Sequence, residues 1–202
     1  MEIRSEQKDA LTELINIGFG RAASSLSNLL NQKIDLATPI VEIHQIDNPS
    51  NRFGDQSNNS KDVIVHQTFE GKFHGDVLLV MDIESSTILI DLLSGGEGVP
   101  HRMTISDREA MAEVGNIMLN AYIGSFSNLL NYQVKFSMVK LFEESIEVVI
   151  NRISKSNTFL QYILLVTTEI RAMKGAVNGK VALIIGEDSL KLLTEDILDY
   201  LD

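Results

Sequence analysis

An internal repeat constrains the fold of this chain more than any other feature of its sequence. Residues 25–31 read Ser-Leu-Ser-Asn-Leu-Leu-Asn, and residues 125–131 match them at six of seven positions. At the same spacing, residues 13–16 (Glu-Leu-Ile-Asn) correspond to residues 113–116 (Glu-Val-Gly-Asn). Self-similarity at a fixed period indicates repeated structural units. The 202 residues are therefore predicted to form two related halves.

A second match lies towards the end of each half. Residues 71–80 resemble residues 175–184, at a slightly larger spacing that a few extra residues in the second half would explain. The stretch 94–101 is rich in glycine and contains a proline, which is typical of a loop. We therefore place the first half at residues 1–98 and the second at residues 99–202. Because related units usually associate symmetrically, the two halves are expected to form one compact pseudo-twofold domain.

Hydrophobic periodicity predicts the same order of elements in both halves. For the first half the expected elements are a helix over 5–30, strands over 40–46, 63–69 and 77–83, a polar loop over 47–61 and a short helix over 85–93. For the second half they are a helix over 106–130, strands over 134–142, 146–153, 159–168 and 181–185, and a helix over 188–201. This predicts an α+β fold of two α-β-β-β-α halves, with helices packed on an antiparallel sheet. The loop over 47–61 is interpreted as a tolerated surface insertion.

The first predicted helix has two distinct faces, and Ser5 is a candidate for its N-cap. Its apolar side carries Leu11, Leu14, Ile15, Gly18, Ala22, Leu26 and Leu29. Its polar side carries Asp9, Glu13, Asn16 and Gly20. A glycine costs about 1 kcal/mol in mid-helix. Gly18 is therefore expected to allow close packing of the helix on the sheet, and Gly20 to let another molecule's backbone approach.

Composition excludes several classes of function. The net charge of −11 argues against nucleic-acid binding, and the absence of cysteine excludes disulfides, thiolate zinc sites and cysteine nucleophiles. The four histidines lack the spacing of a metal site, and no apolar run is long enough to span a membrane. No metal, nucleic-acid or membrane partner is therefore predicted. The charged start of the chain and its lack of cysteine favour a cytoplasmic location.

The remaining candidates are the pairs Glu13–Asn16 and Glu113–Asn116. Side chains three residues apart on a helix project from the same face, so each pair presents a carboxylate beside an amide. Such a pair on an exposed helix is usually solvated surface. Recurrence in both halves favours a function, although common descent would also explain it.

The motif Asp9-x-x-x-Glu13-x-x-Asn16 is followed by Pro39 and by a second Glu113-x-x-Asn116. With this pattern the whole chain resembles the CheC family of chemotaxis phosphatases, the CheC/CheX/FliY group, and most of all a CheC with two sites. The resemblance implies two pseudo-symmetric halves with long exposed helices. It also implies hydrolysis of the aspartyl phosphate of a CheY-type response regulator in two-component signalling.

The implied roles fit the residue types. Asn16 and Asn116 would orient the attacking water, and Glu13 and Glu113 would pair with a lysine of the regulator. Asp9 and Gly20 would contribute to partner binding. The protein would need no cofactor of its own, because the regulator brings Mg²⁺. The resemblance also implies that a protein of this size can bind the deamidase CheD, for which no surface can be assigned here.

The second motif departs from the first at two positions, with Glu109 in place of Asp9 and Val139 in place of Pro39. Ser106-x-x-Glu109 also has the pattern of a capping box, so Glu109 is expected to close the start of its helix. Both sites are predicted to be usable at different rates. Two alternatives remain open: a non-catalytic adaptor or flagellar-switch scaffold of the same fold, and a phosphatase for a regulator outside chemotaxis.

Overall fold

The computed structural model describes residues 4–30, 33–46, 61–172 and 175–201. The first half forms α1 (Ser5–Leu30), β1 (Asp35–Leu36), β2 (Ile40–Gln45), β3 (Asp62–Gly71), β4 (Gly75–Asp82) and α2 (Ile83–Leu93). The second half forms α3 (Ile105–Leu129), β5 (Val134–Phe136), β6 (Lys140–Glu144), α4 (Ile146–Ser156), β7 (Leu160–Ala172), β8 (Gly175–Gly186) and α5 (Glu187–Leu201).

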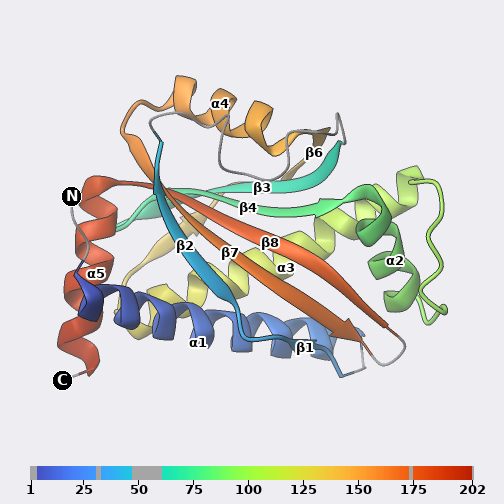
Figure 1. Cartoon of the computed structure of the whole chain (residues 1–202), viewed down its shortest axis with the longest axis horizontal. Coiled ribbons are helices and arrows are strands. Elements are labelled where there is room, and N and C mark those ends of the chain that lie inside the picture. The colour runs from blue at the N-terminus through green and yellow to red at the C-terminus, as the bar shows by residue number, and fades with distance from the viewer. Residues whose placement is uncertain (1–3, 31–32, 47–60, 173–174, 202) are drawn as a thin grey trace.

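The described strands join one antiparallel sheet, in which the first strands of each half pair with a strand of the other half (Figure 1). The central strands β4 and β8 pair with each other, and Leu78 lies opposite Ala182. The early strands β1 and β2 pair with β7 of the second half, and β5 and β6 pair with β3 of the first. The predicted α+β class and antiparallel sheet are confirmed. The boundary predicted between residues 98 and 99 lies in the segment joining α2 to α3 and stays a prediction.

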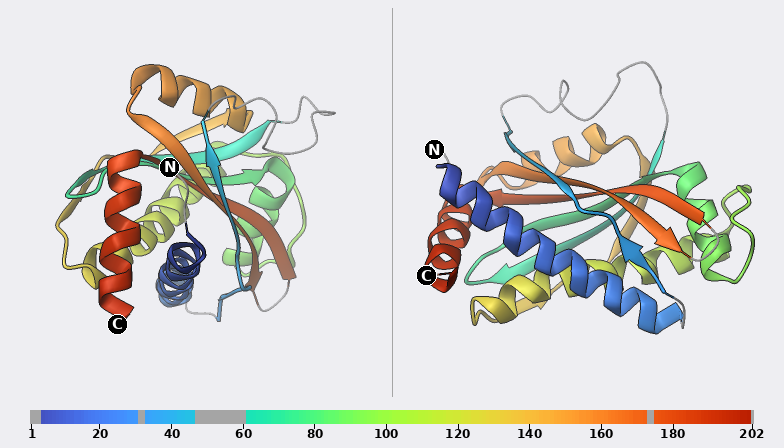
Figure 2. Two further views of the ribbon diagram at one scale, coloured as in Figure 1. Left: turned by 60° about the vertical axis from the view of Figure 1, so that its left-hand side comes forward. Right: turned by 60° about the horizontal axis from the view of Figure 1, so that its bottom comes forward.

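Helices cover both faces of the sheet unequally, as Figure 2 shows: α1, α3 and α5 lie on one side and α4 on the other. Alternation along β4 explains this arrangement, because neighbouring side chains of a strand point to opposite faces. Val77, Leu79 and Met81 belong to the larger core beneath α1, α3 and α5. Leu78 and Val80 join the smaller core beneath α4. The sheet is therefore buried on both faces at its centre.

The strand predicted over residues 146–153 is wrong, because this segment forms α4. Its β-branched residues favour a strand, but its buried residues follow the helical spacing of i, i+3, i+4 and i+7: Ile146, Val149, Ile150 and Ile153. Asp62 of β3 accepts a hydrogen bond from the backbone N–H of Ile146 at 3.3 Å, and burial raises the pKa of this carboxyl. In the first half, the segment between β2 and β3 is the one predicted as a loop over 47–61, and its residues 47–60 lie outside the described residues.

The first half contributes four strands where three were expected, and the second half contributes the four that were expected, with different bounds. The segment predicted as one strand over 134–142 is divided into β5 and β6 by residues 137–139, and the two-residue strand β1 precedes β2. The two long helices begin differently from the prediction as well. The backbone N–H of Arg4 donates to Oε1 of Gln7 at 3.1 Å, so Ser5 is the first helical residue of α1 instead of its N-cap.

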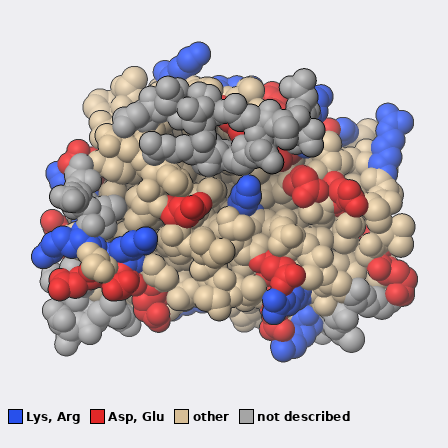
Figure 3. Space-filling view, viewed as in Figure 1, with Lys and Arg blue, Asp and Glu red and all other residues tan. Residues whose placement is uncertain are grey.

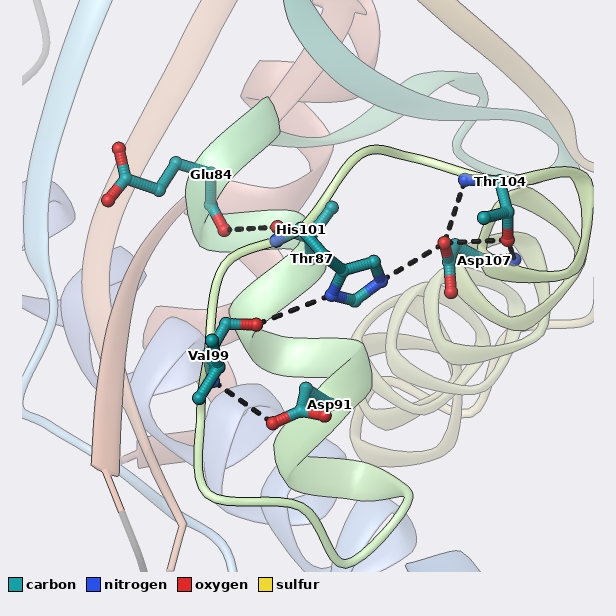
Figure 4. A network of polar contacts seen from close by, with 7 residues as sticks. All are labelled: Glu84, Thr87, Asp91, Val99, His101, Thr104 and Asp107. Carbon is teal, nitrogen blue, oxygen red and sulfur yellow. Dashed lines mark hydrogen bonds and ion pairs between the residues drawn. The ribbon is translucent and has the colours of Figure 1, made fainter.

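The capping box of α3 consists of Thr104 and Asp107, and not of the expected Ser106 and Glu109. Asp107 accepts hydrogen bonds from Thr104 and lies 3.1 Å from Nε2 of His101 (Figure 4). The ring Nδ1 of His101 lies 3.3 Å from the carbonyl oxygen of Val99. Both neighbours are acceptors, so the doubly protonated imidazolium fits this position, and the contacts with Val99 and Asp107 raise the pKa of His101. The network fixes the start of the helix that carries the second acid–amide pair.

Gly18 permits close packing, but against a helix and not against the sheet as expected. A Cβ atom at Gly18 would lie 2.8 Å from the Tyr122 ring, 2.9 Å from Oγ of Ser125 and 3.0 Å from the Phe126 ring. The Phe19 and Tyr122 rings meet edge to face with centroids 5.2 Å apart. The close contact between a helix and the sheet occurs instead at Gly115 of α3, where a Cβ would lie 2.5 Å from the Val65 side chain of β3. The absence of a side chain at Gly18 therefore allows α1 to lie directly beside α3.

Candidate functional site

The helices α1 and α3 present the two acid–amide pairs away from the core. Glu13 and Glu113 are exposed, and Asn16 and Asn116 are half-buried. The adjacent apolar residues of each helix are buried, including Leu14 and Ile15 on α1 and Val114 on α3. Burial of the apolar stripe fixes the rotation of each helix and so determines which side chains another molecule can reach. The two glutamates thus lie on surfaces open to a docking protein, and each half-buried asparagine lies one turn further along the helix.

A hollow of about 580 Å³ lies beside Asn16, between α1 and the segment that leads into β2. Its lining residues are Asn16, Phe19, Gly20, Ala23, Ser24, Ser27 and residues 33–39, which include Pro39. Ile34 anchors this segment to α1, since its backbone N–H donates to Oγ of Ser27 at 2.9 Å. Among the described residues, neither end of the Asn16 amide has a hydrogen-bond partner.

Asn116 is different because its carbonyl oxygen is held within the protein. Asn120, one turn later on α3, donates from Nδ2 to Oδ1 of Asn116 at 3.0 Å. Gln67 of β3 donates from Nε2 to the same oxygen at 3.4 Å and to the backbone carbonyl of Ser137 at 2.9 Å. The second amide therefore belongs to a chain of side-chain contacts that runs from the sheet to the helix.

The first half replaces both of these donors. Gly20 stands where the second half has Asn120, and nothing lies within 4 Å of a Cβ built there. Thr168 corresponds to Gln67: its hydroxyl donates to the carbonyl of Ala37 at 2.8 Å, as Gln67 donates to Ser137. A hydroxyl has a single hydrogen to donate, so Thr168 has none left for Asn16. At these two pseudo-symmetric positions the described residues therefore hold the Asn116 amide and do not hold the Asn16 amide.

The other predicted residues are also at the surface. Asp9 and Gly20 are exposed on the same helix as Glu13. Glu109 is exposed one turn before Glu113, and is free of the capping role assigned to it. On the face seen in Figure 3, described acidic and basic side chains are scattered in small groups, without a continuous basic surface among them. Within the described ranges, no three histidine, aspartate or glutamate side chains gather as metal ligands.

Gln67 and Asn120 were missed by the sequence analysis, although the sequence holds a signal for each. Along β3, Val63, Val65 and Phe69 face the larger core, and the alternation places Gln67 in the same series. A glutamine among apolar residues, here only 2% exposed, marks a polar contact inside the fold. Asn120 stands out when the two halves are aligned, because its counterpart is Gly20.

These features define a class of α+β protein. Two long helices lie side by side on an antiparallel sheet built from strands of both halves, and each helix carries one acid–amide pair. Comparison with known proteins shows which family the chain resembles. The CheC-like family model matches residues 6–43, which hold most of α1 and the start of β2. This confirms the resemblance to the CheC and FliY group that the sequence indicates. In the part of the chain that the structure describes, no helix is long and apolar enough to cross a membrane.

Two curated relatives come from Bacillus subtilis. The flagellar motor switch phosphatase FliY is 29% identical over 138 residues, covering 67% of this chain and 35% of that protein. The CheY-P phosphatase CheC is 30% identical over 138 residues, covering 65% of this chain and 64% of that protein. The chain thus spans about a third of the one and less than two thirds of the other. The nearly equal identities do not favour CheC over FliY.

Solved structures share the fold over almost the whole chain. FliY of Thermotoga maritima matches with a TM-score of 0.78 and 24% identity, covering 99% of this chain and all of that one. A chain of a FliG–FliM complex from H. pylori matches with a TM-score of 0.68 and 12% identity, covering 96% of this chain and all of that one. At identities this low, a structural match shows a shared fold and not a shared activity. The activity must therefore be argued from the residues of the site.

Proposed function

We propose that this protein hydrolyses the aspartyl phosphate of a CheY-type response regulator in chemotaxis signalling. The observation that carries the proposal is the repeated placement of an exposed glutamate one turn before a reachable asparagine, on the outward faces of α1 and α3. The similarity of the chain to proteins named as phosphatases, CheC and FliY, supports it. A cytoplasmic location remains a prediction from the sequence.

The chemistry needs positioning more than a strong base. An aspartyl phosphate is an activated acyl phosphate, so a water held in line with the scissile P–O bond is sufficient for attack. The amide of Asn16 can accept a hydrogen from this water through Oδ1 and donate to a phosphoryl oxygen through Nδ2. It does not titrate near neutral pH. Water is consumed, and the products are inorganic phosphate and the free carboxylate of the regulator.

Glu13 would anchor the complex by an ion pair with a lysine beside the regulator's phosphorylation site. Glu113 would do the same at the second site. The regulator would supply Mg²⁺, so this chain needs no metal of its own for the proposed role. Asp9 lies further along the exposed face of α1, where it can extend the contact. Gly20, with open space around its missing side chain, would let the regulator's backbone come close to the helix.

The first site has the better-formed approach. The hollow beside Asn16 leaves room for a loop or side chain of the regulator next to the amide. Pro39 lines this hollow, and its counterpart in the second half is Val139. A CheD-type deamidase remains a predicted partner without an assigned surface.

One observation supports an adaptor that binds the regulator without hydrolysing its phosphate. The fold is shared with a chain of a FliG–FliM complex, so a protein of this architecture can assemble with another protein. The retention of both asparagines favours the phosphatase. A regulator outside chemotaxis would use the same groups, so the identity of the regulator is part of the test.

The test is the decay of a phosphorylated CheY-type regulator with and without the purified protein. We expect the protein to accelerate release of phosphate, with Mg²⁺ present in both arms. Unchanged decay together with binding of the phosphorylated regulator would favour the adaptor. Acceleration with a non-chemotaxis regulator and none with a chemotaxis regulator would place the same chemistry in another signalling system.

A further inference from the structure

The orientations of the three side-chain amides at the second site, those of Gln67, Asn116 and Asn120, all follow from one backbone carbonyl group. The carbonyl of Ser137 can only accept a hydrogen bond, so the atom of Gln67 that faces it must be Nε2. The same nitrogen faces Asn116, which must therefore present Oδ1. Asn120 lies against that oxygen and must present Nδ2. The direction of hydrogen bonding from the sheet to α3 is thus fixed by the fold.

Both acceptor positions of the Asn116 oxygen are then occupied. A carbonyl oxygen has two lone pairs, and Oδ1 receives one hydrogen from Gln67 and one from Asn120. In this arrangement the oxygen is unable to accept a hydrogen from an attacking water unless one donor withdraws. Only the Nδ2 end of Asn116 is unoccupied by these contacts. By contrast, Asn16 has Thr168 and Gly20 at the corresponding positions and is not held.

The contact with Gln67 is the one more easily broken. Its 3.4 Å separation exceeds the usual 2.7–3.2 Å of an N–H···O hydrogen bond, while the Asn120 contact at 3.0 Å lies within that range. In addition, Oε1 of Gln67 and Oδ1 of Asn120 are buried without a hydrogen-bond partner among the described residues. Unpaired buried acceptors are unfavourable, so these amides are not at their best arrangement, and release of the long Gln67 contact costs no more than one net hydrogen bond.

We propose that Gln67 is a positioning residue that holds the Asn116 carbonyl inside the protein and makes the second site the slower of the two. Gln67 acts only through Asn116, because it is buried and belongs to the sheet. Release of the Gln67 contact frees one lone pair of Asn116 for the water. The inference rests on the proposed function, since it concerns the rate at which the second amide performs that reaction.

The experiment uses Asn16→Ala protein, in which only the second site remains, and adds Gln67→Thr. Threonine at this position can keep the hydrogen bond to Ser137, as Thr168 does to Ala37, and cannot also reach Asn116. With the protein in excess over phosphorylated regulator, we expect the decay rate at saturating protein to rise about two- to tenfold, the factor that one net hydrogen bond represents. The half-saturating concentration should not change, because Gln67 does not reach the surface.

The matched control is Gln45→Thr in the same Asn16→Ala background, because Gln45 is an exposed strand glutamine on β2. It should leave the saturating rate unchanged. An unchanged or lower rate in the Gln67→Thr protein would overturn the inference. So would a change confined to the half-saturating concentration.

A second readout is independent of phosphatase activity. The side-chain NH₂ resonances of Asn116, followed by NMR in the unphosphorylated protein, should move in Gln67→Thr and stay in place in Gln45→Thr. If the Asn116 resonances do not move, Gln67 does not hold this amide and the inference fails while the proposed function stands. If the resonances move but a folded double Asn16→Ala/Asn116→Ala protein keeps full activity, the amides do not position the attacking water, and the claim about rate fails while the phosphatase activity stands. If the wild-type protein does not accelerate decay at all, the proposed function fails, whether or not the resonances move.

Discussion

Replacing Asn16 by alanine should slow the assisted decay of phosphorylated regulator by roughly three- to tenfold, whereas Asn116→Ala should slow it by less than twofold. These figures follow if the second site runs about two- to tenfold below the first, the cost of releasing one net hydrogen bond. The reason is local. Asn16 has no hydrogen bond with the described residues, and Asn116 is held by Gln67 and Asn120.

The two variants are compared by phosphate release at saturating protein, on the same preparation of regulator. Asn28→Ala provides the control, since Asn28 is an exposed asparagine of α1 outside the acid–amide pair. It should retain the wild-type rate. An equal loss from Asn16→Ala and Asn116→Ala would show that the two amides do not work as unequal, independent sites.

Replacing Gly18 by valine should destabilise the protein by at least about 2 kcal/mol, because the added atoms have no space. A Cβ alone would lie within 3.0 Å of the side chains of Tyr122, Ser125 and Phe126, all of them buried. To relieve the overlap, α1 would have to move away from α3. Separation of these helices would also displace Asn16 relative to the rest of the site.

Chemical denaturation of the unphosphorylated protein measures this effect, and Gly20→Ala is the matched control. Gly20 lies on the same helix, is exposed, and has nothing within 4 Å of its missing Cβ. Alanine there should raise the free energy of unfolding by about 0.5–1 kcal/mol, the usual preference over glycine in a helix. A Gly18→Val protein as stable as the wild type would contradict the close helix packing described above.

The order of elements and the faces of the long helices could be predicted from sequence because both depend on local periodicity and on an internal repeat. The repeat aligned Glu13 with Glu113, and helical spacing placed each glutamate on the same side as its asparagine. The exchange of strands between the halves could not be predicted. Periodicity shows which face of a strand is buried, but not which strand it pairs with.

The errors have physical causes. The segment 146–153 is rich in β-branched residues, but its apolar spacing and its contact with Asp62 favour a helix. Gly18 was assigned to packing on the sheet because an apolar helix face does not reveal what covers it. The difference between the two amides depends on Gln67, which is far from Asn116 in sequence and comes beside it only when β3 joins the sheet under α3.

The most direct test of the central claim is single-turnover decay of the phosphorylated regulator with the double Asn16→Ala/Asn116→Ala protein. Circular dichroism should first show that this variant is folded, as expected for two substitutions outside the buried core. If the amides position the attacking water, decay should return to the rate of the regulator alone. A folded double variant that accelerates decay as fast as the wild type would contradict the account.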